Sequence, residues 1–428
     1  MENVISMMIE DERSVEGRAL ELLDRIEAED AELRIFVAID REAVVREARR
    51  LDAVAVGERG ALHGFVLAVK DLIDVAGLPT RAGSRFFRRD PTVDAPVVRR
   101  LRDAGALVIG KTNTHEFAWG ITTENPHFGR TQNPLDRTRI AGGSSGGSGA
   151  AIAAGFADLA LGTDTLGSIR IPSAVCGVVG IRPVTGTFSL DGIVPLAIGL
   201  DTVGPIARDV ATVRAAYAVL SGDSGTRVAP RAVCRLRGGA WERVSPEVVR
   251  GLDALADRLR DAGTTVTDVL WWSDELVPAT SVVQQYAAAL FHAPLIAEHR
   301  AFSGDDVRVR VERALSITEN DLTDARATIA AAHASFRAAT AGYACALAPV
   351  VGEEAPVAPT PPAFREATIP LVTPASAFAL AAMSVPLARG EHGMPLGVQV
   401  LALDADALTL LEFAARVEGL SIDRERAL

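Results

Sequence analysis

Lysine is almost absent from this sequence. Of its 44 basic residues, only Lys70 and Lys111 are lysines, and all the others are arginines. An arginine keeps its proton in a protein, whereas a buried lysine can lose it. In a chain so depleted of lysine, the two that remain are candidates for work that needs a neutral amine. Chance survival explains either one of them equally well.

Cysteine and long apolar runs are scarce as well. Cys176, Cys234 and Cys345 are odd in number and far apart, which argues against a disulfide framework and favours a reducing compartment. The start, MENVISMMIEDERSVEGR, lacks a basic segment followed by an apolar one, so we expect no signal peptide. Glycine or proline interrupts the apolar runs before they reach the length of a membrane span. A cytoplasmic protein without a membrane partner is expected.

Positive charge is also in deficit. The formal net charge of −11 argues against nucleic acid as a partner, because nucleic acid attracts basic patches. No cluster of histidines and cysteines has the spacing of metal ligands. The sequence therefore predicts neither a metal nor an organic cofactor.

Strand and helix patterns alternate along most of the chain. An apolar segment ends at Lys70, an amphipathic helix is predicted over 95–105, and a buried strand follows and reaches Lys111. A second such alternation begins near residue 232 and continues to about residue 272. This order predicts an α/β fold with a largely parallel sheet covered by helices on both faces.

The alternation also suggests how the chain is divided. Residues 1–60 contain two predicted helices that would pack on the core, and 61–428 would form one continuous domain. Within that domain, 272–340 is predicted to be mostly helical and to line a substrate pocket, in which Tyr286 and Phe291 would suit an apolar acyl group. Core packing would explain these two aromatics equally well. The proline-rich stretch Pro356–Pro370 is predicted to be a connecting loop.

Glycine and serine are concentrated between Ala141 and Gly177, in AGGSSGGSGAAIAAGFADLALGTDTLGSIRIPSAVCG. Dense glycine is explained only where the backbone needs positive φ or approaches another group closely. Hydroxyl groups beside exposed backbone N–H groups suit attack on a carbonyl carbon and support of the resulting oxyanion. We interpret the stretch as the lining of an active site.

Three motifs compete for this region and its surroundings. GALVIGKT, from Gly105 to Thr112, matches the phosphate-binding P-loop pattern, but its middle is an apolar strand where a P-loop needs a loop. GGSSG, from Gly142 to Gly146, matches the nucleophile elbow around Ser144. The elbow needs a preceding apolar strand, whereas NPLDRTRIA is polar. It also needs a distinctive histidine, and none of the downstream histidines has such a setting: His292, His299, His333 and His392.

The third arrangement uses serine and lysine without histidine. Lys70 follows a strand, Ser144 opens the glycine-rich loop, and Ser168 precedes a short predicted helix. Burial lowers the pKa of a lysine, so a desolvated Lys70 would be a strong base. A hydroxyl group can carry the proton between that base and a second serine.

The residues of these segments resemble the successive blocks of the amidase signature family. The blocks are GFVLAVKDLIDVAG, GGSSGGSGAAIAAG, LGTDTLGSIRIPSAVCGVVGIRP and LDTVGPIARDV, with weaker similarity in ALAPVVGEEAP and GMPLGVQVLA. The resemblance runs from about residue 20 to the C-terminus. It implies a single α/β/α domain around a central mixed, twisted β-sheet, and hydrolysis of amides through a triad of Ser, cis-Ser and Lys.

The resemblance also implies roles for individual residues. Lys70 is similar to the family's base, Ser144 to the bridging serine with a cis peptide, and Ser168 to the nucleophile. The backbone N–H groups of four consecutive residues resemble the oxyanion hole: Thr165, Leu166, Gly167 and Ser168. Three further residues resemble supporting groups that orient the loop: Ser145, Asp164 and Arg170. For the last two, an ordinary structural ion pair is an equally good interpretation.

Two departures from the family pattern affect the expected pocket. Most members have glycine where this chain has Leu166, and a leucine forced into positive φ would cost about 1–2 kcal/mol. Its N–H group would survive, but its side chain would narrow or reshape the pocket. Ala379-Leu380-Ala381 stands where many members show Gly-x-Pro, which weakens the transfer of later pocket residues.

The resemblance implies an amidase that converts a small-molecule amide, or a ureido-type C–N bond, to an acid and ammonia or an amine through an acyl-enzyme. Two alternatives stay open. One is the amide-hydrolysing A subunit of a tRNA-dependent amidotransferase, although its usual glutamine after the Ile-Arg pair is Ile171 here. The other is a catalytically silent scaffold protein. A homodimer is also left open.

Overall fold

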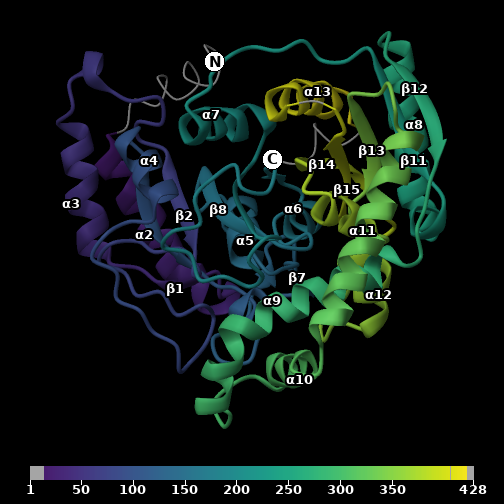
Figure 1. Cartoon of the computed structure of the whole chain (residues 1–428). Coiled ribbons are helices and arrows are strands. Elements are labelled where there is room, and N and C mark those ends of the chain that lie inside the picture. Colours follow the sequence, from purple (N-terminus) through teal and green to yellow (C-terminus); the bar gives the residue numbers. More distant parts are fainter. Residues whose placement is uncertain (1–13, 405, 422–428) are drawn as a thin grey trace.

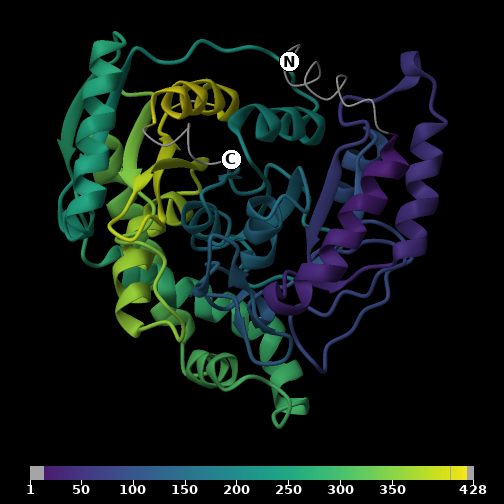
Figure 2. The same cartoon turned by 180° about the vertical axis from the view of Figure 1, so that it is seen from behind.

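A computed structural model describes residues 14–404 and 406–421 of the chain. The expectation about a signal peptide falls mostly on residues outside this range. Within the described residues, no helix is both long enough and apolar enough to cross a membrane. Figures 1 and 2 show a central sheet with helices packed on both of its faces.

Eleven strands form the central sheet, in the spatial order β1-β3-β2-β8-β10-β9-β14-β15-β13-β11-β12. Their bounds are β1 (Phe36–Ala38), β2 (Val66–Lys70), β3 (Leu107–Thr112), β8 (Leu159–Asp164), β9 (Val179–Arg182), β10 (Thr202–Ala207), β11 (Ala232–Arg237), β12 (Thr265–Leu270), β13 (Cys345–Pro349), β14 (Ala382–Arg389) and β15 (Pro395–Ala402). Two small two-stranded sheets lie beside it, made of β4 (Glu124–Asn125) with β5 (Gly129–Arg130) and β6 (Gln132–Asn133) with β7 (Asp136–Ile140).

The sheet is mixed, as the family resemblance implied. Pairing is parallel in β3-β2-β8 and in β13-β11-β12, and antiparallel for the strands between β8 and β13. The largely parallel sheet predicted from the alternation is therefore wrong for the centre. The physical reason is that β9 and β10 are joined without a helix, and β14 and β15 form a hairpin, so these neighbours run in opposite directions.

The α-helices are α2 (Val15–Leu33), α3 (Arg41–Asp52), α4 (Pro96–Asp103), α5 (Gly146–Ala153), α6 (Arg170–Cys176), α7 (Val210–Ser221), α8 (Pro246–Asp261), α9 (Leu276–Glu298), α10 (Asp305–Ala314), α11 (Glu319–Ala339), α12 (Pro362–Ala377) and α13 (Ala407–Leu420). Short 3₁₀ helices are η1 (Val56–Glu58), η2 (Glu116–Ala118) and η3 (Gly239–Glu242). The helical character predicted for 272–340 is confirmed.

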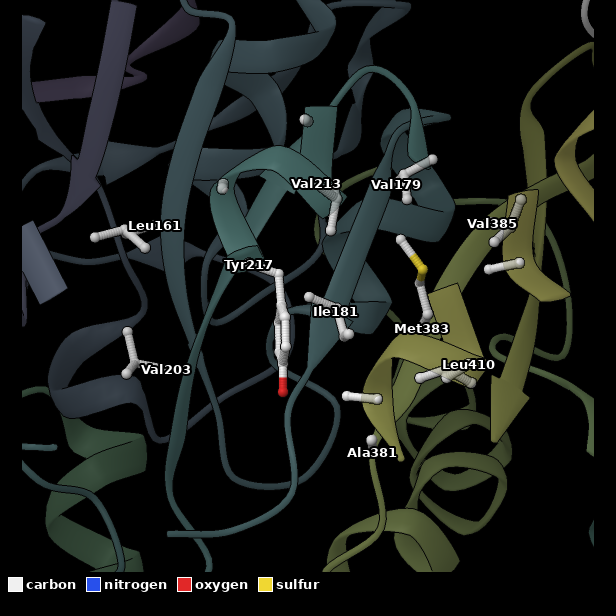
Figure 3. Packing of buried hydrophobic residues seen from close by; sticks show 14 of the residues in the cluster. Leu161, Val179, Ile181, Val203, Val213, Tyr217, Ala381, Met383, Val385 and Leu410 are labelled. Atoms are coloured by element: carbon white, nitrogen blue, oxygen red, sulfur yellow. The ribbon is translucent and has the colours of Figure 1, made fainter. Parts of the chain in front are cut away.

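Each face of the sheet buries its own apolar core. Along β2, Leu67 and Val69 belong to the core under α4, α7, α8 and α13, whereas Val66 and Ala68 belong to the core shared with α2, α3, α5 and α6. This alternation follows from the two-residue period of a strand. Figure 3 shows the first core, where side chains from β8, β9, β10 and α7 meet those of β14 and α13.

The prediction of a loop over Pro356–Pro370 is wrong for its second half. Helix α12 begins at Pro362, and Pro370 lies inside it together with Pro374. Proline is favoured in the first turn of a helix, and the apolar side chains of α12 bury their face against the rest of the molecule. Tertiary packing here outweighs the cost of proline within a helix.

Candidate active site

Lys70 is the last residue of β2 and is fully buried. Its Nζ lies 2.7 Å from Ser144 Oγ and 2.8 Å from Thr163 Oγ1. Burial lowers the pKa of Lys70 to about 7, although the charges of Asp164 and Asp201 oppose the shift. Near neutral pH a large share of the molecules therefore carries an uncharged amine that can accept a proton from Ser144.

Ser144 lies in the glycine-rich loop that precedes α5, and its peptide bond with Gly143 is cis. Its carbonyl oxygen accepts hydrogen bonds from Thr114 Oγ1 at 2.9 Å and from Thr123 Oγ1 at 3.2 Å. A Cβ on Gly143 would stand only 2.7 Å from the backbone nitrogen of Thr122. Close approach of two backbones thus explains this glycine and holds the Ser144 hydroxyl against Lys70.

Ser145 joins the two loops of the glycine and serine stretch. Its N–H donates to the carbonyl oxygen of Ser168 at 3.1 Å. Its hydroxyl donates to the carbonyl oxygen of Thr163 at 3.1 Å and accepts from the Thr163 N–H at 3.3 Å. Thr163 also contacts Lys70, so these bonds connect all three residues of the predicted triad.

Ser168 is 4% exposed, and its hydroxyl makes no hydrogen bond to any residue in the described part of the chain. It lines a narrow cavity of about 10 Å³, which is close to the space that one water molecule needs. Leu166, which is 6% exposed, lines the same cavity, as its size suggested. A hydroxyl without an internal partner, at the edge of a cavity, is available to a ligand.

The four predicted oxyanion-binding N–H groups are not equivalent. The Gly167 N–H donates to Asp164 Oδ1 at 2.8 Å and so already has a partner, which corrects the expectation for this residue. The N–H groups of Thr165, Leu166 and Ser168 have no hydrogen-bond acceptor among the described residues. Gly167 instead supplies the positive φ of +92° that the turn requires.

Leu166 does not strain the backbone, because it is not among the residues with positive φ. The cost considered for a leucine at this place therefore does not arise. The left-handed conformation falls one residue later, on Gly167.

Asp164 holds the turn that carries Ser168 in place through a buried ion network. Its carboxylate accepts from Arg170 Nε at 3.1 Å and from Arg182 Nη1 at 3.3 Å, and also from the N–H of Ile169 at 3.2 Å. Burial alone would raise the pKa of Asp164, but the two guanidinium groups lower it below its ordinary value. Asp164 and Arg170 therefore stand in a structural ion pair, which was one of the two interpretations left open.

Residues that the sequence analysis did not single out form most of the cavity wall. They are Ala118, Trp119, Gly120, Ile121, Leu196, Gln284, Arg310, Arg365 and Ile369. Gln284 and Arg310 come from the predicted pocket segment 272–340, but Tyr286 and Phe291 do not line this cavity. The motifs carried no signal for Arg365, because it lies in the stretch predicted to be a loop.

The competing motifs do not form sites. Gly110, Lys111 and Thr112 of the P-loop pattern lie within strand β3. Lys111 is fully buried with Nζ 3.3 Å from Asp71 Oδ1 and 2.9 Å from Thr80 Oγ1, so this second lysine is part of a structural ion pair.

None of the four histidines considered for a nucleophile elbow contacts Ser144. His292 bonds to the carbonyl oxygen of Pro195 at 3.0 Å, and His392 pairs with Glu354 at 2.7 Å. His299 packs against Phe86, and His333 stacks on Phe378. The residue that contacts the Ser144 hydroxyl is Lys70.

Comparison with known proteins now identifies the family. The family model described as Amidase matches residues 19–411, so the chain belongs to the amidase signature family. A solved structure described as an amidase superposes with a TM-score of 0.89 at 35% identity, covering 95% of this chain and 96% of that one. The α/β fold and the family resemblance are thereby confirmed.

Among curated proteins, similar sequences are A subunits of glutamyl-tRNA(Gln) amidotransferase. The one from Nitratidesulfovibrio vulgaris is 33% identical over an alignment 448 positions long, gaps included, which covers 92% of this chain and 91% of that protein. The one from Acidothermus cellulolyticus is 45% identical over 240 residues, which cover 54% of this chain and about half, 48%, of that protein. The solved A subunit from Thermotoga maritima is 26% identical with a TM-score of 0.79, covering 97% of this chain and 93% of that one.

Proposed function

We propose that this protein hydrolyses a small-molecule amide through an acyl-enzyme on Ser168, with Ser144 as the proton carrier and Lys70 as the base. The observation that carries the proposal is the buried contact of 2.7 Å between Lys70 Nζ and Ser144 Oγ. A lysine with a pKa of about 7 can take a proton that an ordinary lysine, charged at neutral pH, cannot. Membership of the amidase signature family supports the same chemistry.

In the first half of the reaction, Ser168 Oγ attacks the amide carbon and gives its proton to Ser144 as Ser144 passes its own to Lys70. The N–H groups of Thr165, Leu166 and Ser168 are the donors that remain for the oxyanion, because that of Gly167 is engaged by Asp164. Collapse of the tetrahedral intermediate breaks the C–N bond. The departing nitrogen receives a proton from Ser144, which Lys70 replenishes.

In the second half, water attacks the acyl carbon and transfers a proton along the same route. The bond to Ser168 Oγ breaks, the serine regains its proton, and the acid leaves. The overall change is amide plus water to acid plus ammonia or amine. The three buried, unpaired cysteines suit the reducing cytoplasm that we propose as the location.

The test is release of ammonia or amine by the purified chain from a panel of short aliphatic, aryl and ureido amides. Ser168→Ala and Lys70→Ala should each lower kcat by about 10⁴-fold or more while the thermal unfolding curve keeps its shape. Ser189→Ala, an exposed serine outside the cavity, is the matched control and should keep full activity. Full activity in Lys70→Ala would remove the proposed base.

A second candidate is the A subunit of an amidotransferase, which the curated relatives favour directly. It uses the same triad but would deliver ammonia to a partner protein. Ile171, in place of the glutamine usual for that subunit, speaks for an enzyme that acts alone. Turnover by the isolated chain that is unaffected by added amidotransferase partner subunits supports the first function, and glutamine hydrolysis that requires them supports the second.

A further inference from the structure

Two arginines line the cavity beside Ser168. Arg310 comes from α10 and Arg365 from α12, and both helices pack against α9. In Figure 1, α10 lies at the lower edge of the molecule and α12 on its right side. Carboxylates outnumber basic residues in this chain, 55 to 44. The cavity wall with its two guanidinium groups is therefore positively charged, whereas the molecule as a whole is negatively charged.

These arginines have few partners within the protein. Arg310 Nη1 donates to the carbonyl oxygen of Trp119 at 2.8 Å, and its other guanidinium nitrogens have no hydrogen-bond partner among the described residues. Arg365 makes no hydrogen bond and no ion pair with any described residue. Because both arginines are only half-buried, water accepts from their free donors, and a ligand with acceptor oxygens can take the place of that water.

The nearby negative charge does not balance the pair. Asp306 is the carboxylate whose charge acts on both Arg310 and Arg365, and its Oδ2 is already bonded to His115 Nε2 at 2.8 Å. Burial, followed by the charge of Arg310, lowers the pKa of Arg365 to about 10, which leaves it charged at neutral pH. One shared carboxylate against two arginines leaves the empty pocket with excess positive charge.

A neutral polar group points to the same ligand-binding wall. Gln284 of α9 is only 7% exposed and lines the cavity, and its side-chain amide makes no hydrogen bond to any described residue. The amide atoms keep accessible surface on the cavity side, where water or a ligand can bond to them. Together with the arginines it offers several donors facing the space beside the Ser168 hydroxyl.

We propose that the substrate is a small amide that also carries a carboxylate, and that Arg310 and Arg365 bind this carboxylate while Ser168 attacks the amide carbon. The guanidinium fork matches a carboxylate in geometry and charge. This inference rests on the proposed hydrolytic function and names the class of substrate for that site.

The test compares matched amides that differ in the carboxylate. In the first pair, succinamate carries the carboxylate on its acyl part, and butyramide is its neutral counterpart. In the second pair, N-butyrylglycine carries the carboxylate on its amine part, and N-methylbutyramide is its neutral counterpart. In the unaltered protein, kcat/KM should be about 10- to 100-fold higher for the charged member of at least one pair. Arg365→Gln should remove that preference, so that kcat/KM for the charged member falls to about the value for the neutral member.

Two variants separate charge recognition from a structural role. Arg365→Lys keeps the charge without the fork and should retain part of the preference. Arg313→Gln, on α10 but outside the cavity, should retain all of it. Equal kcat/KM for the charged and neutral members of both pairs in the unaltered protein would overturn the proposal, as would a preference that survives in Arg365→Gln.

Binding to Ser168→Ala distinguishes failure of this inference from failure of the proposed function. Calorimetry should show succinamate or N-butyrylglycine binding about 10- to 100-fold more tightly than its neutral partner, and Arg365→Gln should abolish the difference. This readout needs no turnover. If Ser168→Ala still hydrolyses amides, the catalytic assignment fails, but the binding comparison still decides the carboxylate preference. Equal binding of the charged and neutral members in both pairs overturns the carboxylate proposal.

Discussion

At the scale of single residues, the two lysines show how environment decides chemistry. Lys70 faces two hydroxyl groups and no carboxylate within ion-pairing distance, whereas Lys111 faces Asp71. Burial lowers the pKa of both amines, and nearby carboxylate charges oppose this shift at both. Only at Lys111 does a carboxylate, that of Asp71, also oppose it through a direct hydrogen bond. The first is arranged to exchange a proton and the second to hold a charge.

The pH dependence of hydrolysis follows from Lys70. Below a pKa of about 7 the amine is protonated and cannot accept a proton, so kcat/KM should fall as the pH drops through that value and level off above it. Burial lowers the pKa of Arg182 only to about 10, so this group stays charged across the range and adds no second limb. A pH profile of kcat/KM measured between pH 5 and 9 checks the prediction.

Lys70→Arg is the sharpest variant for this profile, because arginine keeps the positive charge but cannot deprotonate. It should be inactive at every pH in that range. An active Lys70→Arg protein with an unchanged profile would show that the limb belongs to another group.

Leu166 sets the size of the pocket without straining the backbone. Leu166→Ala removes side-chain volume from the cavity wall and should raise kcat/KM for a bulky acyl amide about tenfold relative to a short one. Leu166→Met conserves volume and should leave the ratio unchanged. Kinetics on amides of graded size measure this ratio, and a constant ratio in Leu166→Ala would exclude contact of Leu166 with the acyl group.

At the scale of elements, Arg170 connects the nucleophile turn to α12. Its guanidinium group donates to the carbonyl oxygen of Val372 at 3.0 Å, to Gln399 Oε1 at 2.9 Å and to Ser376 Oγ at 2.9 Å. These bonds join α6, α12 and β15. They explain how α12, which carries Arg365, is held at the pocket.

Arg170→Met should lower the free energy of unfolding by about 3–5 kcal/mol, because it removes one of the two guanidinium partners of Asp164 and the donor to three further buried groups on α12 and β15. The matched control is Arg250→Met on α8, where an exposed pair with Glu247 contributes about 0–1 kcal/mol. Urea unfolding measures both. Equal losses in the two variants would contradict a stabilising role for the buried network.

At the scale of the whole molecule, the three cysteines report on global unfolding. Cys176 lies in α6, Cys234 in β11 and Cys345 in β13, and all are buried and unpaired. Burial raises the pKa of each thiol to about 12, so almost no reactive thiolate is present at neutral pH.

A thiol reagent should therefore label none of the three in the native protein and all three after denaturation. Labelling at low urea should be slow and similar for all three cysteines. They lie in different buried clusters of one sheet, so only global unfolding exposes them together. Mass spectrometry of labelled peptides measures each site. Rapid labelling of one cysteine in native buffer would reveal a local opening that the packing does not suggest.

The sequence by itself determined the family, the α/β class and the contact of Lys70 with Ser144. The glycines and serines of the motif stand close together in the sequence, so the motif can be recognised without the structure. Gly143 is part of it because a Cβ there would collide with the backbone of Thr122. That local requirement is visible in one sequence. The helical nature of 272–340 was visible for the same reason, since periodicity is a property of neighbouring residues.

Only the tertiary structure decided the pocket and the direction of the central strands. Arg310 and Arg365 are brought to Ser168 by the packing of α10 and α12, and Gly167 is distinguished from its neighbours by a hydrogen bond to Asp164. Such contacts join distant segments through burial and loop closure, so no local pattern of residues encodes them. The family of this protein was therefore readable from its motifs, whereas the shape and charge of the cavity beside Ser168 were not.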